Sequence, residues 1–156
     1  MRRSLINNNI GSVSSCTMRP EDLIPSFLWE VRRQKRTVPG HRRECRAIEA
    51  RSNKDGYFES EDCHFDLESL FDMLDAYAPM YFYFGAHPGD GADYGYWLSE
   101  SFEEDFDGLK VSDLSEVPNT YSGEVLLVND HGNMSLYVAR ARKRKPVELS
   151  EVWAIV

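Results

Sequence analysis

The stretch PMYFYFGAHPGDGADYGYWLS, residues 79–99, is the densest aromatic run in the chain and decides the fold prediction. Met80–Phe84 alternates its side chains between two faces and is bounded by Pro79 and Gly85, a pattern typical of a β-strand. Tyr94–Leu98 shows the same alternation. The Pro- and Gly-rich residues between these two runs permit a sharp reversal of the backbone. The stretch therefore predicts a β-hairpin.

The residues before this hairpin predict helices. Apolar residues recur at helical spacing over about residues 21–34 and again over 65–77, so each helix has one apolar face. A weaker pattern over residues 41–52 predicts a shorter helix that is rich in arginine. Residues 1–19 are rich in Asn and Ser with little periodic pattern. We expect them to form a flexible leader that contributes little to the core.

The residues after the hairpin carry further strand patterns, at 124–128, 134–139 and 151–156. Residues 140–146 (RARKRKP) are expected to form a basic loop. Three helices followed by about five strands predict an α+β fold, with N-terminal helices packed on a twisted, mainly antiparallel sheet. The length of 156 residues fits a single domain of this kind over residues 20–156.

The charge of the chain is unevenly distributed. The formal net charge is −8. Residues 1–51 carry 11 basic and 5 acidic side chains, whereas residues 52–139 carry 2 basic and 19 acidic ones. Such a split marks an interaction surface, or else basic helices lie against an acidic sheet and neutralise it. The sequence leaves both interpretations open.

The sequence also indicates the compartment. No apolar run approaches the roughly 20 residues of a membrane-spanning helix, and the first residues lack the apolar core of a signal peptide. The three cysteines, Cys16, Cys45 and Cys63, have no metal-binding spacing and argue against a disulfide framework. We therefore expect a cytoplasmic protein that needs no cofactor and contacts no membrane.

The favoured function is that of a non-enzymatic, protein-binding accessory factor that acts through an acidic, aromatic-rich surface. Tyr and Trp are concentrated in the acidic half, and no complete catalytic motif is present. The residues expected to make the contact are Tyr81, Tyr83, Tyr94, Tyr96, Trp97, Glu103, Glu104 and Asp105. A related hypothesis is that this surface imitates the phosphates of a nucleic acid and so inhibits a protein that binds one. The basic segments lack interleaved aromatic residues, which argues against direct binding of nucleic acid.

The alternative is a function of another class, a small metal-assisted hydrolase. It would use two clusters at hairpin tips, His87, Asp90 and Asp93 in one and Asp130 and His131 in the other. The same residues are also common in sharp turns that bind nothing. A third possibility is a homo-oligomer that pairs through an edge strand such as residues 151–156.

Three segments also carry a resemblance: YFYFGAHPGDGADYGYWLS (81–99), VNDHGNMSLYV (128–138) and EVWAIV (151–156), which together make up 36 of the 156 residues. On these residues, within the ranges 81–98 and 128–156, the chain resembles a set of small uncharacterised accessory proteins of bacteria and phages. The resemblance implies a source in bacteria or their mobile elements, and it brings no activity, cofactor or site residue.

Overall fold

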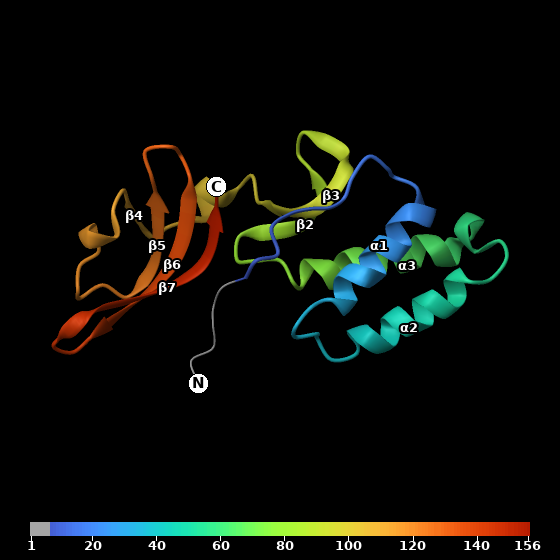
Figure 1. The fold of residues 1–156 in the computed structure, drawn as a ribbon, viewed down its shortest axis with the longest axis horizontal. Helices are drawn as coiled ribbons and strands as arrows, with labels where there is room; N and C mark the ends of the chain where they lie inside the picture. The colour runs from blue at the N-terminus through green and yellow to red at the C-terminus, as the bar shows by residue number, and fades with distance from the viewer. Residues whose placement is uncertain (1–6) are drawn as a thin grey trace. The chain divides into compact units, whose positions relative to one another are not determined.

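The computed structural model describes residues 7–156, which form two compact units (Figure 1). Residues 9–99 form the first, called the N-terminal unit below. Residues 100–156, together with Asn7 and Asn8, form the C-terminal unit. The sequence predicts that residues 20–156 form a single domain. Whether the two units behave as one domain is not tested by the structure of each unit alone, so this stays a prediction.

The N-terminal unit combines helices with a small antiparallel sheet. Its elements are β1 (Gly11–Ser14), α1 (Pro20–Arg32), α2 (His41–Ser52), the 3-10 helix η1 (Tyr57–Glu59), α3 (Glu61–Asp75), β2 (Phe82–His87) and β3 (Asp90–Leu98). The strand order is β1-β3-β2, and both pairings are antiparallel. β1 and β2 are therefore the edge strands of this sheet.

The predicted hairpin is present as β2 and β3, with Pro88 and Gly89 alone in the turn between them. The predicted helices correspond to α1, α2 and α3. α3 begins four residues before its predicted start, because the Ser60 hydroxyl accepts the backbone N–H of Cys63 and caps the first turn.

β1 differs from the prediction. Gly11–Ser14 lies in the segment expected to be a flexible leader, yet it pairs with β3; residues 1–6 of that segment lie outside the described residues. The strand is only four residues long and its sequence, GSVS, lacks an apolar alternation. Gly95 in β3 makes the pairing possible, since a Cβ there would lie 2.1 Å from the carbonyl oxygen of Gly11.

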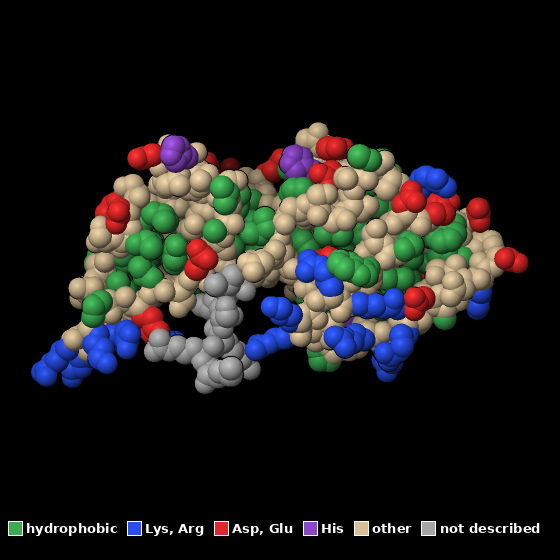
Figure 2. All heavy atoms as spheres, in the orientation of Figure 1, with side chains coloured by type: hydrophobic (Ala, Val, Ile, Leu, Met, Phe, Trp, Pro, Cys, Tyr) green, Lys and Arg blue, Asp and Glu red, His purple; other side chains and the backbone are tan. Residues whose placement is uncertain are grey.

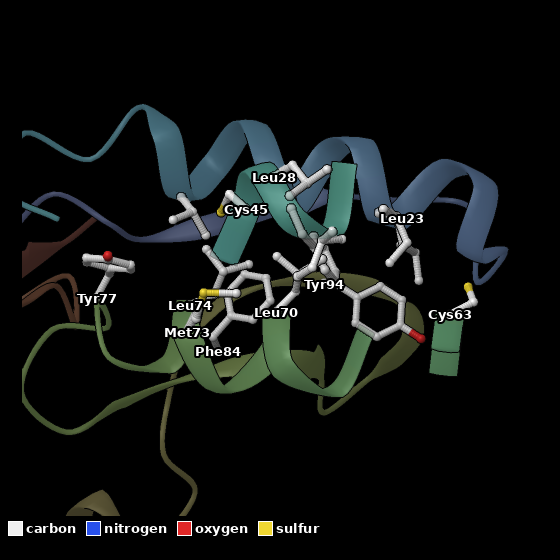
Figure 3. Close-up of a cluster of buried hydrophobic side chains, with 14 of the residues drawn as sticks. Leu23, Leu28, Cys45, Cys63, Leu70, Met73, Leu74, Tyr77, Phe84 and Tyr94 are labelled. Carbon is white, nitrogen blue, oxygen red and sulfur yellow. The ribbon is translucent and has the colours of Figure 1, made fainter. Parts of the chain in front are cut away.

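The core of the N-terminal unit lies between the helices and one face of the sheet. Side chains that meet there come from every one of these elements, including Leu23, Leu28, Cys45, Leu70, Leu74, Phe84 and Tyr94 (Figure 3). Phe27 of α1 is fully buried, and its ring packs edge-on against Phe71 and Phe84 at centroid distances of 5.1 and 5.2 Å. Each such side chain stabilises the unit by about 1.5–3 kcal/mol.

The C-terminal unit is built on a mixed sheet of order β4-β5-β6-β7. Its elements are α4 (Phe102–Asp105), β4 (Leu109–Val111), the 3-10 helix η2 (Leu114–Glu116), β5 (Gly123–Val128), β6 (Met134–Arg142) and β7 (Lys145–Ile155). β4 runs parallel to β5, and the other pairings are antiparallel.

The predicted basic loop over residues 140–146 is the end of a hairpin instead. β6 continues to Arg142 and β7 begins at Lys145, so Lys143 and Arg144 alone form the turn. Arg144 adopts a positive φ of 56°, as tight hairpin turns require. Long basic side chains suit such a projecting hairpin because they extend into water.

The α+β class and the mainly antiparallel pairing are confirmed, with the long helices before most of the strands. The strands of the described residues number seven and lie in two sheets, where the sequence predicted one sheet of about five strands. No helix within residues 7–156 has the length and apolar character that crossing a membrane requires.

Candidate functional site

A groove of about 500 Å³ lies between α1 and the edge strand β1 of the N-terminal unit. One wall is formed by residues 10–13. The other is formed by successive turns of α1 and by the residue after it: Pro25, Ser26, Trp29, Glu30 and Arg33. Tyr96 of β3, which is 1% exposed, also lines the groove. The groove therefore joins a sheet edge to one face of a helix.

Trp29 is the most exposed aromatic side chain of this groove. The buried apolar residues of α1 are Leu23, Ile24, Phe27, Leu28 and Val31. Trp29 is not one of them and is 65% exposed, and Ile10 on the opposite wall is 36% exposed. A tryptophan held on a helix and open to solvent is typical of the anchors that dominate protein interfaces.

A buried network of hydrogen bonds underlies the groove. Glu30 is 2% exposed and forms a two-pronged ion pair with Arg33, which donates from Nε and Nη2. The Glu30 Oε1 atom also accepts from the Tyr96 hydroxyl at 3.0 Å and from the Gln34 side-chain amide at 3.1 Å. These donors compensate a carboxylate whose burial would otherwise be costly.

The network affects the pKa values of Tyr96 and Arg33 and holds the position of β1. Burial, reinforced by the Glu30 carboxylate, raises the pKa of Tyr96 well above its ordinary value, so its hydroxyl remains a donor. The hydrogen bonds to Glu30 raise the pKa of Arg33. Arg33 Nη2 also donates to Asn9 Oδ1 at 3.2 Å, and Asn9 donates to Gln34 at 2.9 Å. The chain that leads into β1 is thereby tied to the end of α1.

The predicted aromatic residues separate onto two faces of the sheet. Tyr94 and Tyr96 point into the core and are 9% and 1% exposed. Tyr83 and Trp97 are cross-strand partners on the opposite face and are half-buried. Tyr81, also half-buried, lies just before β2. The structure thus brings Tyr83 and Trp97 together on an outer face, and it places Tyr94 and Tyr96 inside.

The predicted acidic residues belong to the other unit. Glu103, Glu104 and Asp105 lie in α4, and all three are exposed. The Ser101 hydroxyl donates to Asp105 at 2.6 Å, a bond local to this turn. A surface that combines these acids with the aromatic residues of the N-terminal unit stays a prediction.

The residues of the alternative metal site take part in local turn and strand contacts. His87 Nδ1 accepts the backbone N–H of Gly89 at 2.9 Å, and Asp90 accepts that of Ala92 at 3.0 Å. Asp93 accepts from the hydroxyl of Ser12 in β1. His87 and Asp90 therefore form hydrogen bonds in and beside the turn between β2 and β3, and Asp93 forms one between β3 and β1.

The second cluster, Asp130 and His131, lies in the turn between β5 and β6 of the C-terminal unit. The His131 backbone N–H donates to the Asn129 side chain at 2.9 Å. Over residues 7–156, no three His, Cys, Asp or Glu side chains are grouped so that they could hold a metal ion. The metal-assisted hydrolase stays a prediction.

Sequence reasoning missed the groove. The signal that could have revealed it is Trp29, a large apolar residue outside the apolar stripe of its own helix. Glu30 and Arg33 are three residues apart and would have been expected to form an exposed helical pair. The burial of Glu30 beside Tyr96, which is distant in the sequence, could not be read from this spacing. No match was found when the chain was compared with models of protein families, with curated proteins and with solved structures.

Proposed function

We propose that this protein is a non-enzymatic binding protein that takes up an extended segment of a partner protein in the groove between α1 and β1. The observation that carries this proposal is the exposed Trp29 in a groove whose other wall is an edge strand. An edge strand offers backbone donors and acceptors to an added strand, while the walls of the groove take its side chains.

The dimensions of the groove support a short segment. The four residues of β1 span about 13 Å at the rise of a β-strand. The volume of about 500 Å³ lies within the range of pockets that enclose a few side chains. The irregular pairing between Ser12 and Ser14 makes β1 a poor template for an extended sheet, which favours one short partner strand over open-ended association.

This proposal keeps the protein-binding function that the sequence favours. It places the binding site in the groove between α1 and β1, and not on the acidic, aromatic-rich surface. Tyr94 and Tyr96 are core residues, and Trp29 takes the role of the aromatic anchor. Within the proposal the protein is an accessory factor, and its source in a phage or mobile element rests on the sequence resemblance alone. Contact through the acidic α4, including imitation of a nucleic acid, remains a separate hypothesis.

The test is a selection of random peptides of about twelve residues, long enough to cross the groove as a strand, displayed against the whole chain. Selected peptides are then synthesised and their dissociation constants measured by fluorescence anisotropy. We expect one sequence family with apolar residues at alternate positions. Trp29→Ala should weaken its binding at least about tenfold, as loss of an interface anchor does.

Phe65→Ala is the matched control, since Phe65 is an aromatic residue on α3 that is 59% exposed and does not line the groove. It should leave the dissociation constant unchanged. Selection of no sequence family, or equal losses in Trp29→Ala and Phe65→Ala, would show that the groove is not a peptide site.

A further inference from the structure

We infer that the segment bound in this groove is acidic and that one of its carboxylates pairs with Arg33. This inference rests on the proposed function and adds the chemical class of the partner. It follows from how Arg33 is held and from the charge of the surface around it.

Arg33 is a preorganised cation with donor capacity to spare. Its Nε and Nη2 atoms are bound to Glu30, while Nη1 forms no hydrogen bond with any of the residues that the structure describes. The side chain lines the groove and is 39% exposed, against 3% for the side chain of Glu30. A guanidinium whose position is already fixed loses little further freedom when it binds a second carboxylate.

The positive charge continues beyond the groove. The connection after α1 and the exposed side of α2 carry further cations that form no ion pair within residues 7–156: Lys35, Arg36, Arg42, Arg43 and Arg46. Figure 2 shows Lys and Arg side chains gathered over this side of the helices. The acids of this region are already engaged, Glu49 by Arg32 and Glu44 by Arg51. This surface therefore attracts an acidic segment.

The rest of the N-terminal unit favours a short acidic peptide over a nucleic acid. Residues 9–99 carry 15 acidic and 10 basic side chains, so the unit as a whole repels a long polyanion. A short segment meets only the basic side. The groove also presents the apolar surfaces of Trp29 and Ile10 and a sheet edge, which suit side chains and a peptide backbone.

The test is a double-mutant cycle on the whole chain with a selected peptide. In the protein, Glu30→Gln and Arg33→Gln are combined, because the amide introduced at position 30 can still accept from Tyr96 and no buried charge is left unpaired. In the peptide, each Asp or Glu is changed to its amide. We expect one peptide substitution to weaken binding to the natural protein about tenfold, and to have an effect below about twofold on the double variant. Thermal unfolding verifies that the double variant is folded.

Two controls separate this inference from the proposed function. Lys54→Gln removes an exposed cation that does not line the groove, and it should not change the affinity. Binding to the natural protein should weaken at high salt, as expected for surface charges. Two outcomes would overturn the acidic partner but not the peptide-binding groove. In the first, the selected peptides need Trp29 but contain no Asp or Glu. In the second, changing their acids weakens binding equally to the natural protein and to the double variant. Failure of the selection itself, or tighter binding of a nucleic acid or of a second copy of the chain, would overturn both.

Discussion

At the scale of single residues, the groove depends on a carboxylate that would be costly to bury alone. Tyr96→Phe removes the hydroxyl that donates to Glu30 at 3.0 Å and leaves every apolar contact of the ring in place. The buried Glu30 carboxylate keeps its donors from Arg33 and Gln34 but loses a hydrogen bond to a charged group. We therefore expect the free energy of unfolding to fall by about 1–3 kcal/mol. Denaturant unfolding measures this loss.

Tyr83→Phe is the matched substitution on the outer face of the same sheet. The Tyr83 hydroxyl donates to the Ala86 carbonyl at 2.8 Å and is half-buried, so water can replace it. Its loss should cost less, about 0.5–1.5 kcal/mol. An equal or larger loss in Tyr83→Phe would mean that the buried hydrogen bond to Glu30 stabilises the protein no more than an ordinary half-buried one.

A second prediction at this scale concerns pH. Burial lowers the pKa of His41, whose Nδ1 lies 2.7 Å from the Tyr77 hydroxyl. The unfolded chain therefore binds a proton at His41 more readily than the folded one. The stability from this group is present above its unfolded pKa of about 6.5 and is lost as the pH falls below that value.

His41→Gln removes this titration. We expect the stability difference between about pH 7.5 and about pH 5.5 to be smaller in the variant than in the natural protein. Urea unfolding at both pH values gives the comparison, and the remaining histidines cancel because they occur in both proteins. The same pH dependence in the two proteins would contradict the assigned role of His41.

At the scale of elements, β1 is the most vulnerable part of the site. Gly95→Ala places a Cβ 2.1 Å from the Gly11 carbonyl oxygen, so β1 must move away from β3. We expect a loss of about 1–3 kcal/mol in the free energy of unfolding, together with loss of peptide binding. Gly91→Ala in the same strand is the control, since a Cβ there meets nothing within 4 Å. Amide hydrogen exchange of Gly11–Ser14 should accelerate in Gly95→Ala and not in Gly91→Ala.

The elements that could be predicted from the sequence are those with strong local patterns. The hairpin of β2 and β3 and the helices α1 to α3 each have a periodicity that follows from burying one face. β1 could not be predicted, because GSVS has no such pattern and is held by a glycine that lies far along the chain, at position 95. The groove that Trp29 and Arg33 line could not be predicted either, because its other wall is β1.

At the scale of the whole molecule, each unit has a core of its own. Leu74 is fully buried in the core of the N-terminal unit, and Val125 is fully buried in that of the C-terminal unit. Truncating either to Ala leaves a cavity, which costs about 2–5 kcal/mol for Leu and less for the smaller Val. We expect each loss to fall on the unit that contains the cavity.

Trp153, which is 1% exposed, reports on the C-terminal unit once Trp29 and Trp97 are replaced by Phe. In that background, Val125→Ala should shift the unfolding transition seen by Trp153 fluorescence to lower denaturant, and Leu74→Ala should leave it in place. Circular dichroism of the helices, which belong mainly to the N-terminal unit, should show the reverse. If Leu74→Ala shifts both transitions together, the two units unfold as one, and the single domain predicted over residues 20–156 is the better description.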